Sequence, residues 1–82
     1  MENIHIEVRL FAYLRDLLPL ESRGIKKIEI KTTLTIDNLM DNIGIVEKEI
    51  MIVIINGIRR LDYNESMKEG DRVAIFPPVG GG

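Results

Sequence analysis

One well-signalled helix, at residues 36–43, lies between segments that alternate like β-strands, and this arrangement limits the fold most. Thr35 is a good N-cap, and Asp37 lies in the first turn, where the helix dipole favours an acidic side chain. Gly44 fits the left-handed position that follows a helix. A helix of about two turns with a single apolar stripe is expected to pack on one face of a small sheet.

Strand patterns account for most of the remaining chain. Residues 4–11 alternate between apolar and polar side chains, which predicts a half-buried strand. Residues 50–55 are continuously apolar, which predicts a strand that is covered on both faces. The other expected elements are a short helix at 12–18 ended by Pro19, a strand around 28–30, a turn at Asn56-Gly57, a short edge strand at 58–63 and a last strand at 72–76.

This order of elements predicts an α+β domain with a mixed sheet of four to five strands, one main helix and one short helix, and a β-grasp topology suits it. We expect residues 4–10 to pair with the strand at 50–55 in the centre of the sheet. The crossover that carries the main helix is of the kind that joins parallel strands. Residues 1–78 are expected to form one domain. Residues 79–82 are expected to be a flexible tail, because glycines bury too little surface to offset the cost of ordering them.

Composition excludes several classes of site. The chain of 82 residues has no cysteine, which rules out disulfides, thiolate zinc sites, iron–sulfur clusters and a cysteine nucleophile. Because His5 is the only histidine, we expect no metal site. The net charge of −2 and the scattered basic residues do not fit a nucleic-acid partner. The sequence contains neither a long apolar span nor a signal-peptide pattern, so we expect a cytoplasmic protein without a membrane partner.

The chain ends in Gly80-Gly81-Gly82, after Phe76-Pro77-Pro78-Val79. Without side chains, these glycines present a carboxylate that fits a very narrow channel. The two prolines end the preceding strand and stiffen the exit from the domain. Four residues beyond Pro78 reach roughly 13–14 Å, enough to deliver an end group into another protein's active site. An ordinary disordered terminus or a cloning remnant is the plainer alternative.

Two segments resemble the small subunit of molybdopterin synthase (MoaD-like proteins). Residues 8–18, Val-Arg-Leu-Phe-Ala-Tyr-Leu-Arg-Asp-Leu-Leu, are similar to the first strand and helix of that family. Residues 69–82 are similar to its Gly-Asp-x-Val-Ala-x-x-Pro-Pro-Val-x-Gly-Gly ending. The one departure is Gly80, where other small residues are common. The middle of the chain is compatible but less specific.

The resemblance implies a ubiquitin-like sulfur carrier. A partner adenylyltransferase, similar to ubiquitin-activating enzymes, would use ATP to adenylate Gly82, and a sulfur donor enzyme would supply the sulfur of a thiocarboxylate. The large subunit of molybdopterin synthase would then present the pterin precursor that accepts this sulfur, and molybdenum or tungsten would enter the product later. The chain has no phosphate-binding loop. We therefore expect a carrier without its own catalytic machinery and without a bound cofactor.

Two other functions fit the same ending. A ubiquitin-like modifier would join Gly82 to target lysines, and a carrier for thiamin thiazole synthesis would pass its sulfur to another pathway. A plain β-grasp interaction module is the simplest alternative.

The partner-binding residues that we expect are Phe76, Pro77, Pro78, Val79, Gly80 and Gly81. Strict alternation points Phe76 away from the helix, which favours a docking anchor over a core aromatic residue. Arg15, Arg59 and Arg60 could pair with an acidic partner, although such charges are more often solvated.

Overall fold

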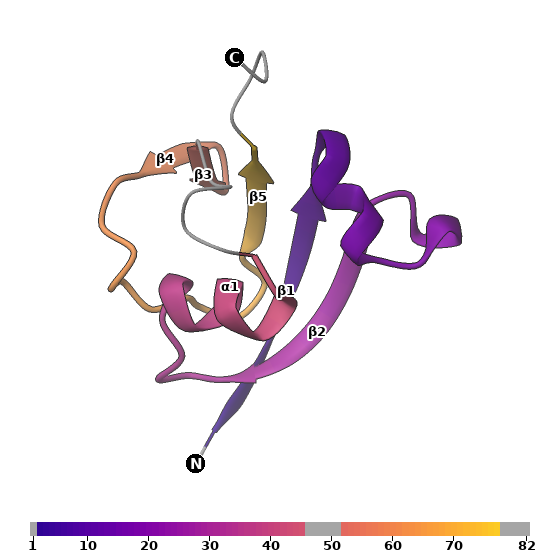
Figure 1. Ribbon diagram of the computed structural model, residues 1–82. Coiled ribbons are helices and arrows are strands. Elements are labelled where there is room, and N and C mark those ends of the chain that lie inside the picture. The colour runs from indigo at the N-terminus through magenta and orange to yellow at the C-terminus, as the bar shows by residue number, and fades with distance from the viewer. Residues whose placement is uncertain (1, 46–51, 78–82) are drawn as a thin grey trace.

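The computed structural model describes residues 2–45 and 52–77, which form a five-stranded mixed sheet with the strand order β2-β1-β5-β3-β4 (Figure 1). The elements are β1 (Asn3–Leu10), the 3₁₀ helices η1 (Ala12–Leu17) and η2 (Leu20–Ser22), β2 (Ile25–Lys31), α1 (Ile36–Ile43), β3 (Ile52–Ile55), β4 (Ile58–Arg60) and β5 (Arg72–Phe76). The expected α+β class and β-grasp topology are confirmed.

The pairing of the central strands differs from the prediction. β1 pairs with β2 in antiparallel and with β5 in parallel orientation, and β5 pairs with β3 in antiparallel orientation. The predicted direct pairing of residues 4–10 with the strand at 50–55 is therefore wrong, because β5 lies between them: Val73 is opposite Val8, and Ile75 is opposite Val53. Apolar alternation shows which face of a strand is buried, but it does not identify the neighbouring strand. β2 and β3 run in the same direction, separated by two strands.

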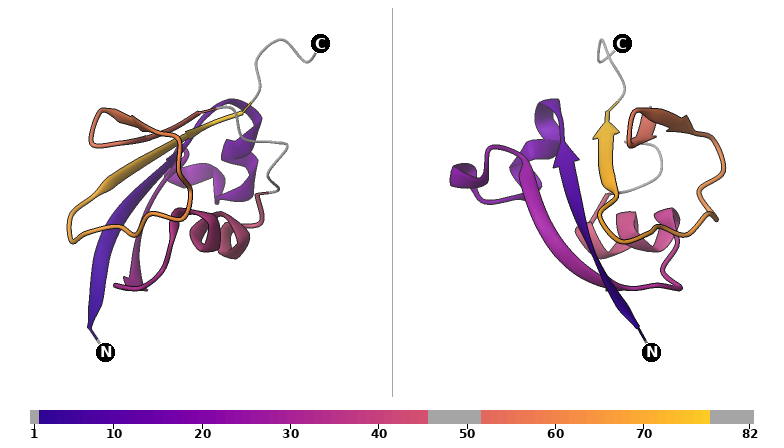
Figure 2. Two further views of the ribbon diagram at one scale, coloured as in Figure 1. Left: turned by 90° about the vertical axis from the view of Figure 1, so that its left-hand side faces the viewer. Right: turned by 180° about the vertical axis from the view of Figure 1, so that it is seen from behind.

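The core lies between one face of the sheet and α1 (Figure 2). Every second residue of β1, β3 and β5 points into it, and α1 contributes the opposite wall. Its buried members include Ile4, Ile6, Val8 and Leu10 from β1, Val53 and Ile55 from β3, Val73 and Ile75 from β5, and Ile36, Leu39 and Met40 from α1. Since all these side chains face one side of the sheet, residues 2–45 and 52–77 place no core on the other side.

The main helix begins and ends where the sequence predicts. The Thr35 hydroxyl accepts a hydrogen bond from the Asn38 backbone N–H at 3.1 Å, and the Asn38 side chain accepts one from the Thr35 N–H at 3.4 Å. This reciprocal capping box satisfies two N–H groups at the helix start. Gly44 ends the helix in the left-handed conformation, with φ of 98°.

A polar network holds the start of β5 against the turn that joins β3 to β4. The Asp71 carboxylate accepts hydrogen bonds from the Asn56 side-chain amide and from the Lys68 backbone N–H, both at 2.8 Å. The Asn56 side-chain oxygen accepts one from the Arg72 N–H at 2.9 Å. Asn56 and Gly57 both have positive φ, as a tight hairpin turn requires. Asp71 thus has a structural role, because its carboxylate connects the β3–β4 turn to the segment before β5.

Candidate functional site

The sheet face opposite α1 carries the candidate site. In β3, Val53 and Ile55 are buried in the core, whereas Ile52 and Ile54 are half-buried on the opposite face. The prediction that this strand is covered on both faces is therefore wrong within the described residues. The reason lies in the architecture, because α1 packs on one side of the sheet only (Figure 2). The outer face thus keeps apolar side chains that the described part of the domain does not cover.

An aromatic pair lies at the end of this face where the chain leaves β5. Phe76 is on the outer side, as alternation predicts, and its ring stacks on that of Phe11 with centroids 4.2 Å apart and an interplanar angle of 13°. The Phe11 N–H donates a hydrogen bond to the Ile75 carbonyl at 3.2 Å, which continues the parallel register of β1 and β5. Ile52 is opposite Phe76 on the other side. An apolar row therefore runs from Phe11, just after β1, across Phe76 of β5 to Ile52 of β3.

Phe11 was not among the predicted partner-binding residues. The alternation of β1 places it on the outward side, so its exposure was readable from the sequence. Its position beside Phe76 was not, because it depends on the parallel pairing of β1 with β5. The Phe11 side chain remains 37% exposed despite the stack. Together with the half-buried Phe76, Ile52 and Ile54 it forms a contiguous apolar surface of the kind that marks interaction sites.

A shallow depression of about 320 Å³ adjoins this pair. Ile54 and Ala74 are neighbours in the β3–β5 register, and Arg9 is opposite Ala74 on the other side. The complete lining is Arg9, Phe11, Ile54, Asn56, Gly57, Arg72 and Ala74. The depression therefore combines an apolar floor with arginine side chains, a composition that is typical of protein interfaces.

The predicted reactive end cannot be placed on this face. Pro77 is described: it follows β5 directly and is buried. The predicted reacting residue Gly82, the predicted partner contacts from Pro78 to Gly81 and the expected boundary between domain and tail lie outside the described residues.

The described residues hold no cluster that could bind a metal ion. Within 2–45 and 52–77, no three His, Cys, Asp or Glu side chains gather as a metal site would require. His5 is an exposed surface residue, and its Nδ1 lies 3.5 Å from the Glu69 carboxylate. Across the same ranges, no helix combines the length and apolar character needed to span a lipid bilayer.

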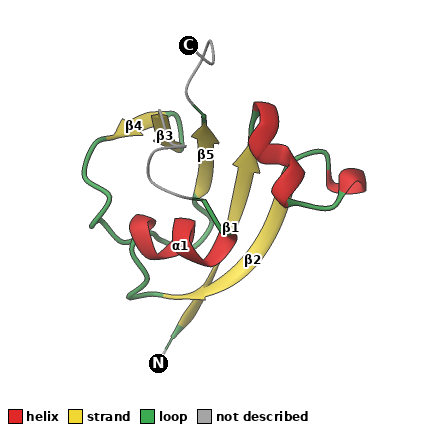
Figure 3. Cartoon of the chain, viewed as in Figure 1, coloured by secondary structure: helices red, strands yellow, loops and turns green. Residues whose placement is uncertain are grey.

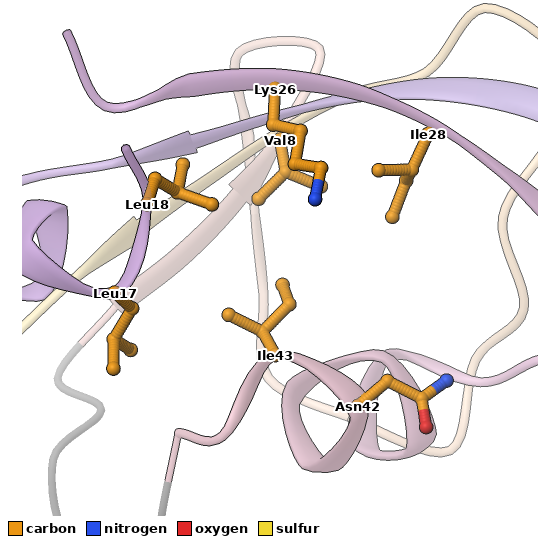
Figure 4. A pocket seen from close by; sticks show the side chains of 7 residues that line it. All are labelled: Val8, Leu17, Leu18, Lys26, Ile28, Asn42 and Ile43. Carbon is orange, nitrogen blue, oxygen red and sulfur yellow. The ribbon is translucent and has the colours of Figure 1, made fainter. Parts of the chain in front are cut away.

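A second recess, of about 210 Å³, lies on the helix side between the end of η1 and the end of α1 (Figure 4). It is lined by the aliphatic side chains of Val8, Leu17, Leu18, Ile28 and Ile43 and by Lys26 and Asn42. This lining offers no nucleophile with a neighbouring base. The recess is a packing gap between two helical segments, and the outer face remains the stronger candidate site.

The strand order, the single main helix on one face and the exit of the chain from a central strand define a ubiquitin-like β-grasp protein. Its candidate site is the outer sheet face, and the described residues form no cluster that could hold a metal ion. Residues 8–82 match the ThiS family, and the chain belongs to this family of ubiquitin-like sulfur carriers.

Solved structures share the fold. A putative molybdopterin converting factor subunit 1 from Pyrococcus furiosus is 24% identical, with 93% of this chain and 99% of that chain covered and a TM-score of 0.70. The small archaeal modifier protein 1 of H. volcanii is 23% identical, with the same coverage and a TM-score of 0.71. A complex of subunits 1 and 2 of the molybdopterin-converting factor from Helicobacter pylori contains a chain that is 24% identical, with 96% and 100% covered and a TM-score of 0.59. No curated protein sequence matches the chain.

Proposed function

We propose that this chain is the small, sulfur-carrying subunit of a molybdopterin synthase and that its outer sheet face docks onto the proteins that act on Gly82. The observation that carries the proposal is the stacked Phe11–Phe76 pair at the exit of the last strand, on a sheet face that α1 leaves uncovered. The family match, which runs to Gly82, supports it.

The proposed chemistry needs only the terminal carboxylate from this chain. A partner adenylyltransferase binds ATP, and the ionised Gly82 carboxylate attacks the α-phosphate and releases pyrophosphate. The resulting acyl adenylate contains a good leaving group. Sulfide (HS⁻) released by a donor enzyme attacks the acyl carbon. The new C–S bond forms as the C–O bond to AMP breaks, so AMP leaves and a thiocarboxylate remains at Gly82. The large subunit of the synthase then presents the pterin precursor that accepts the sulfur.

The outer face supplies the docking energy in this scheme. Phe11 and Phe76 form a rigid aromatic anchor, and Ile52 and Ile54 extend the apolar surface across β3. Aromatic side chains at the centre of an interface commonly dominate its binding energy. The H. pylori complex of subunits 1 and 2 supports a large-subunit partner. Since the adenylyltransferase and the large subunit both act on Gly82, they bind this chain in turn.

A second candidate is a protein modifier, which the similarity to the small archaeal modifier protein favours. In this case the adenylated Gly82 would be transferred to a target lysine as an isopeptide. A carrier for thiamin thiazole synthesis would share the first two steps with the synthase subunit and differ only in the acceptor of the sulfur. A modifier forms an isopeptide at Gly82, whereas both carriers form a thiocarboxylate, so the product distinguishes the modifier from the carriers. Transfer of the sulfur to a pterin precursor by the large subunit distinguishes the synthase subunit from the thiamin carrier.

The test is ATP–pyrophosphate exchange by the adenylyltransferase encoded in the same genome. We expect exchange with the full chain and none after deletion of Gly82, because the carboxylate then retreats by roughly 3.3–3.6 Å. Adding one residue after Gly82 should abolish exchange as well. Thermal stability should stay unchanged in both variants. Normal exchange by the shortened chain would show that the ending has no role in activation.

A further inference from the structure

Three arginines converge on a recess at the corner where β1 ends and β2 begins. The recess has a volume of about 190 Å³ and is lined by Arg9, Arg15, Arg23, Leu10, Phe11, Gly24 and Ile25. Figure 3 shows η1 and η2 beside this corner, at the β2 side of the sheet. No acidic side chain contributes to the lining. The recess therefore concentrates positive charge in a chain whose net charge is −2.

Two of these arginines lie at tight turns of the backbone. A Cβ atom on Gly24 would lie 2.6 Å from the Leu10 carbonyl oxygen and 3.0 Å from Cγ of Arg15, so the stem of Arg15 lies directly over this glycine. Arg23 ends η2 in the left-handed conformation with φ of 55°, and Ala12 has φ of 52° at the start of η1. These two turns set the backbone positions from which Arg15 and Arg23 line the recess.

The charges of the recess are poorly compensated within the described residues. Arg9 pairs with Glu7 at 2.6 Å between Nε and Oε2. Across residues 2–45 and 52–77, neither Arg15 nor Arg23 forms an ion pair. Like charges that share a small concave surface repel one another, and a carboxylate placed between them would remove this cost. The recess is thus complementary to an acidic ligand group.

The recess is continuous with the docking face proposed above. Phe11 and Arg9 both line the recess as well as the depression over Ile54 and Ala74. A protein that covers the aromatic pair would therefore extend over the recess. This continuity favours a protein segment as the occupant over a free anion or a nucleic acid.

We propose that an acidic segment of the docking partner places aspartate or glutamate carboxylates among Arg9, Arg15 and Arg23 when the partner binds Phe11 and Phe76. This inference rests on the proposed function. The planar guanidinium groups bind carboxylates through paired hydrogen bonds, which set orientation as well as affinity. The contact would orient the domain so that its last strand points at the partner's active site.

The test measures affinity for the large subunit and for the adenylyltransferase at low and high salt. The double variant Arg15→Glu/Arg23→Glu should bind at least about tenfold more weakly than the unchanged chain, chiefly through slower association. Its affinity should depend less on salt. Arg15→Gln/Arg23→Gln should lose less affinity than the glutamate variant. Because it removes the charges without reversing them, it controls for a folding defect caused by the charge reversal. Circular dichroism checks the fold of each variant.

The matched control is Lys31→Glu/Lys68→Glu, which changes the net charge equally at exposed positions away from the recess. We expect its affinity to change by less than about threefold. If the control loses as much affinity as the arginine variants, the effect is one of general charge. If the arginine variants keep full affinity, no group of the partner binds in the recess. Either result overturns the inference. Saturable binding of inorganic phosphate that shifts the Gly24 amide signal and competes with neither partner would also overturn it.

Failure of the proposed function can be distinguished from failure of this inference. If the unchanged chain neither binds these partners nor gains sulfur at Gly82, the carrier assignment is wrong. The proposal of an acidic docking segment is then wrong as well. If the unchanged chain binds and gains sulfur while the arginine variants behave normally, only the inference is wrong.

Discussion

Replacing Phe76 with aspartate should damage partner binding more than stability. Phe76 is half-buried on the outer face and contacts Phe11 through a stack with centroids 4.2 Å apart. Losing the stack costs about 0.5–1.5 kcal/mol, and losing half the burial of a phenylalanine costs about 1 kcal/mol more. A domain of this size has a free energy of unfolding of roughly 4–12 kcal/mol. The variant should therefore remain folded.

The same substitution should weaken docking strongly. A charged side chain would lie at the centre of the proposed aromatic anchor, where truncations cost about 2 kcal/mol or more. The dissociation constant for the large subunit should rise about 30-fold. Calorimetric titration measures this value, and urea unfolding followed by circular dichroism measures the stability.

The control for this prediction is Ile75→Ala, one residue earlier in β5. Ile75 is fully buried on the core side, so its truncation should cost about 2–5 kcal/mol of stability and change docking of the folded protein little. The reasoning is refuted if Phe76→Asp mainly unfolds the domain. It is also refuted if Ile75→Ala, measured where it is folded, weakens docking as much as Phe76→Asp.

Three further predictions concern the scaffold. Asp71→Ala should lower the free energy of unfolding by about 2 kcal/mol, because the Asn56 amide and a backbone N–H lose their charged acceptor; an unchanged urea midpoint would contradict this. Gly24→Ala should lower the melting temperature more than Gly57→Ala does. Both glycines have positive φ, but only at Gly24 would a Cβ collide with a carbonyl oxygen, and equal melting temperatures would refute this prediction. Thr35→Ala should lower the free energy of unfolding by about 1 kcal/mol, because the helix loses its N-cap. Thermal unfolding measures this change, and an unchanged stability would show that the cap contributes nothing.

Features with local causes were predictable from the sequence. The capping threonine and the left-handed glycine marked both ends of α1, and alternation identified the buried face of β1. Alternation also placed Phe76 on the outer face. Each of these features depends on residues within one turn of helix or one strand, where spacing alone determines the outcome.

Features that depend on contacts between distant segments were missed. Placing β5 between β1 and β3 requires comparing strand partners more than 60 residues apart, and no local pattern encodes that choice. The Phe11–Phe76 stack follows from this pairing and was missed with it. The continuous apolar run of β3 predicted burial on both faces, but among the described residues only one face is covered by the core, and Ile52 and Ile54 are half-buried on the other. In the proposed complex a partner covers the other.

The central claim is that Gly82 carries sulfur, and intact mass spectrometry tests it most directly. The full chain is incubated with ATP, the adenylyltransferase encoded in the same genome and a sulfur donor, and an otherwise identical reaction lacks ATP. We predict a mass increase equal to the exchange of one oxygen for sulfur, located by fragmentation at Gly82 and absent without ATP. Isopeptide conjugates to lysines would instead identify a modifier. An unchanged mass, with an adenylyltransferase that catalyses ATP–pyrophosphate exchange on this chain, would contradict the sulfur-carrier function.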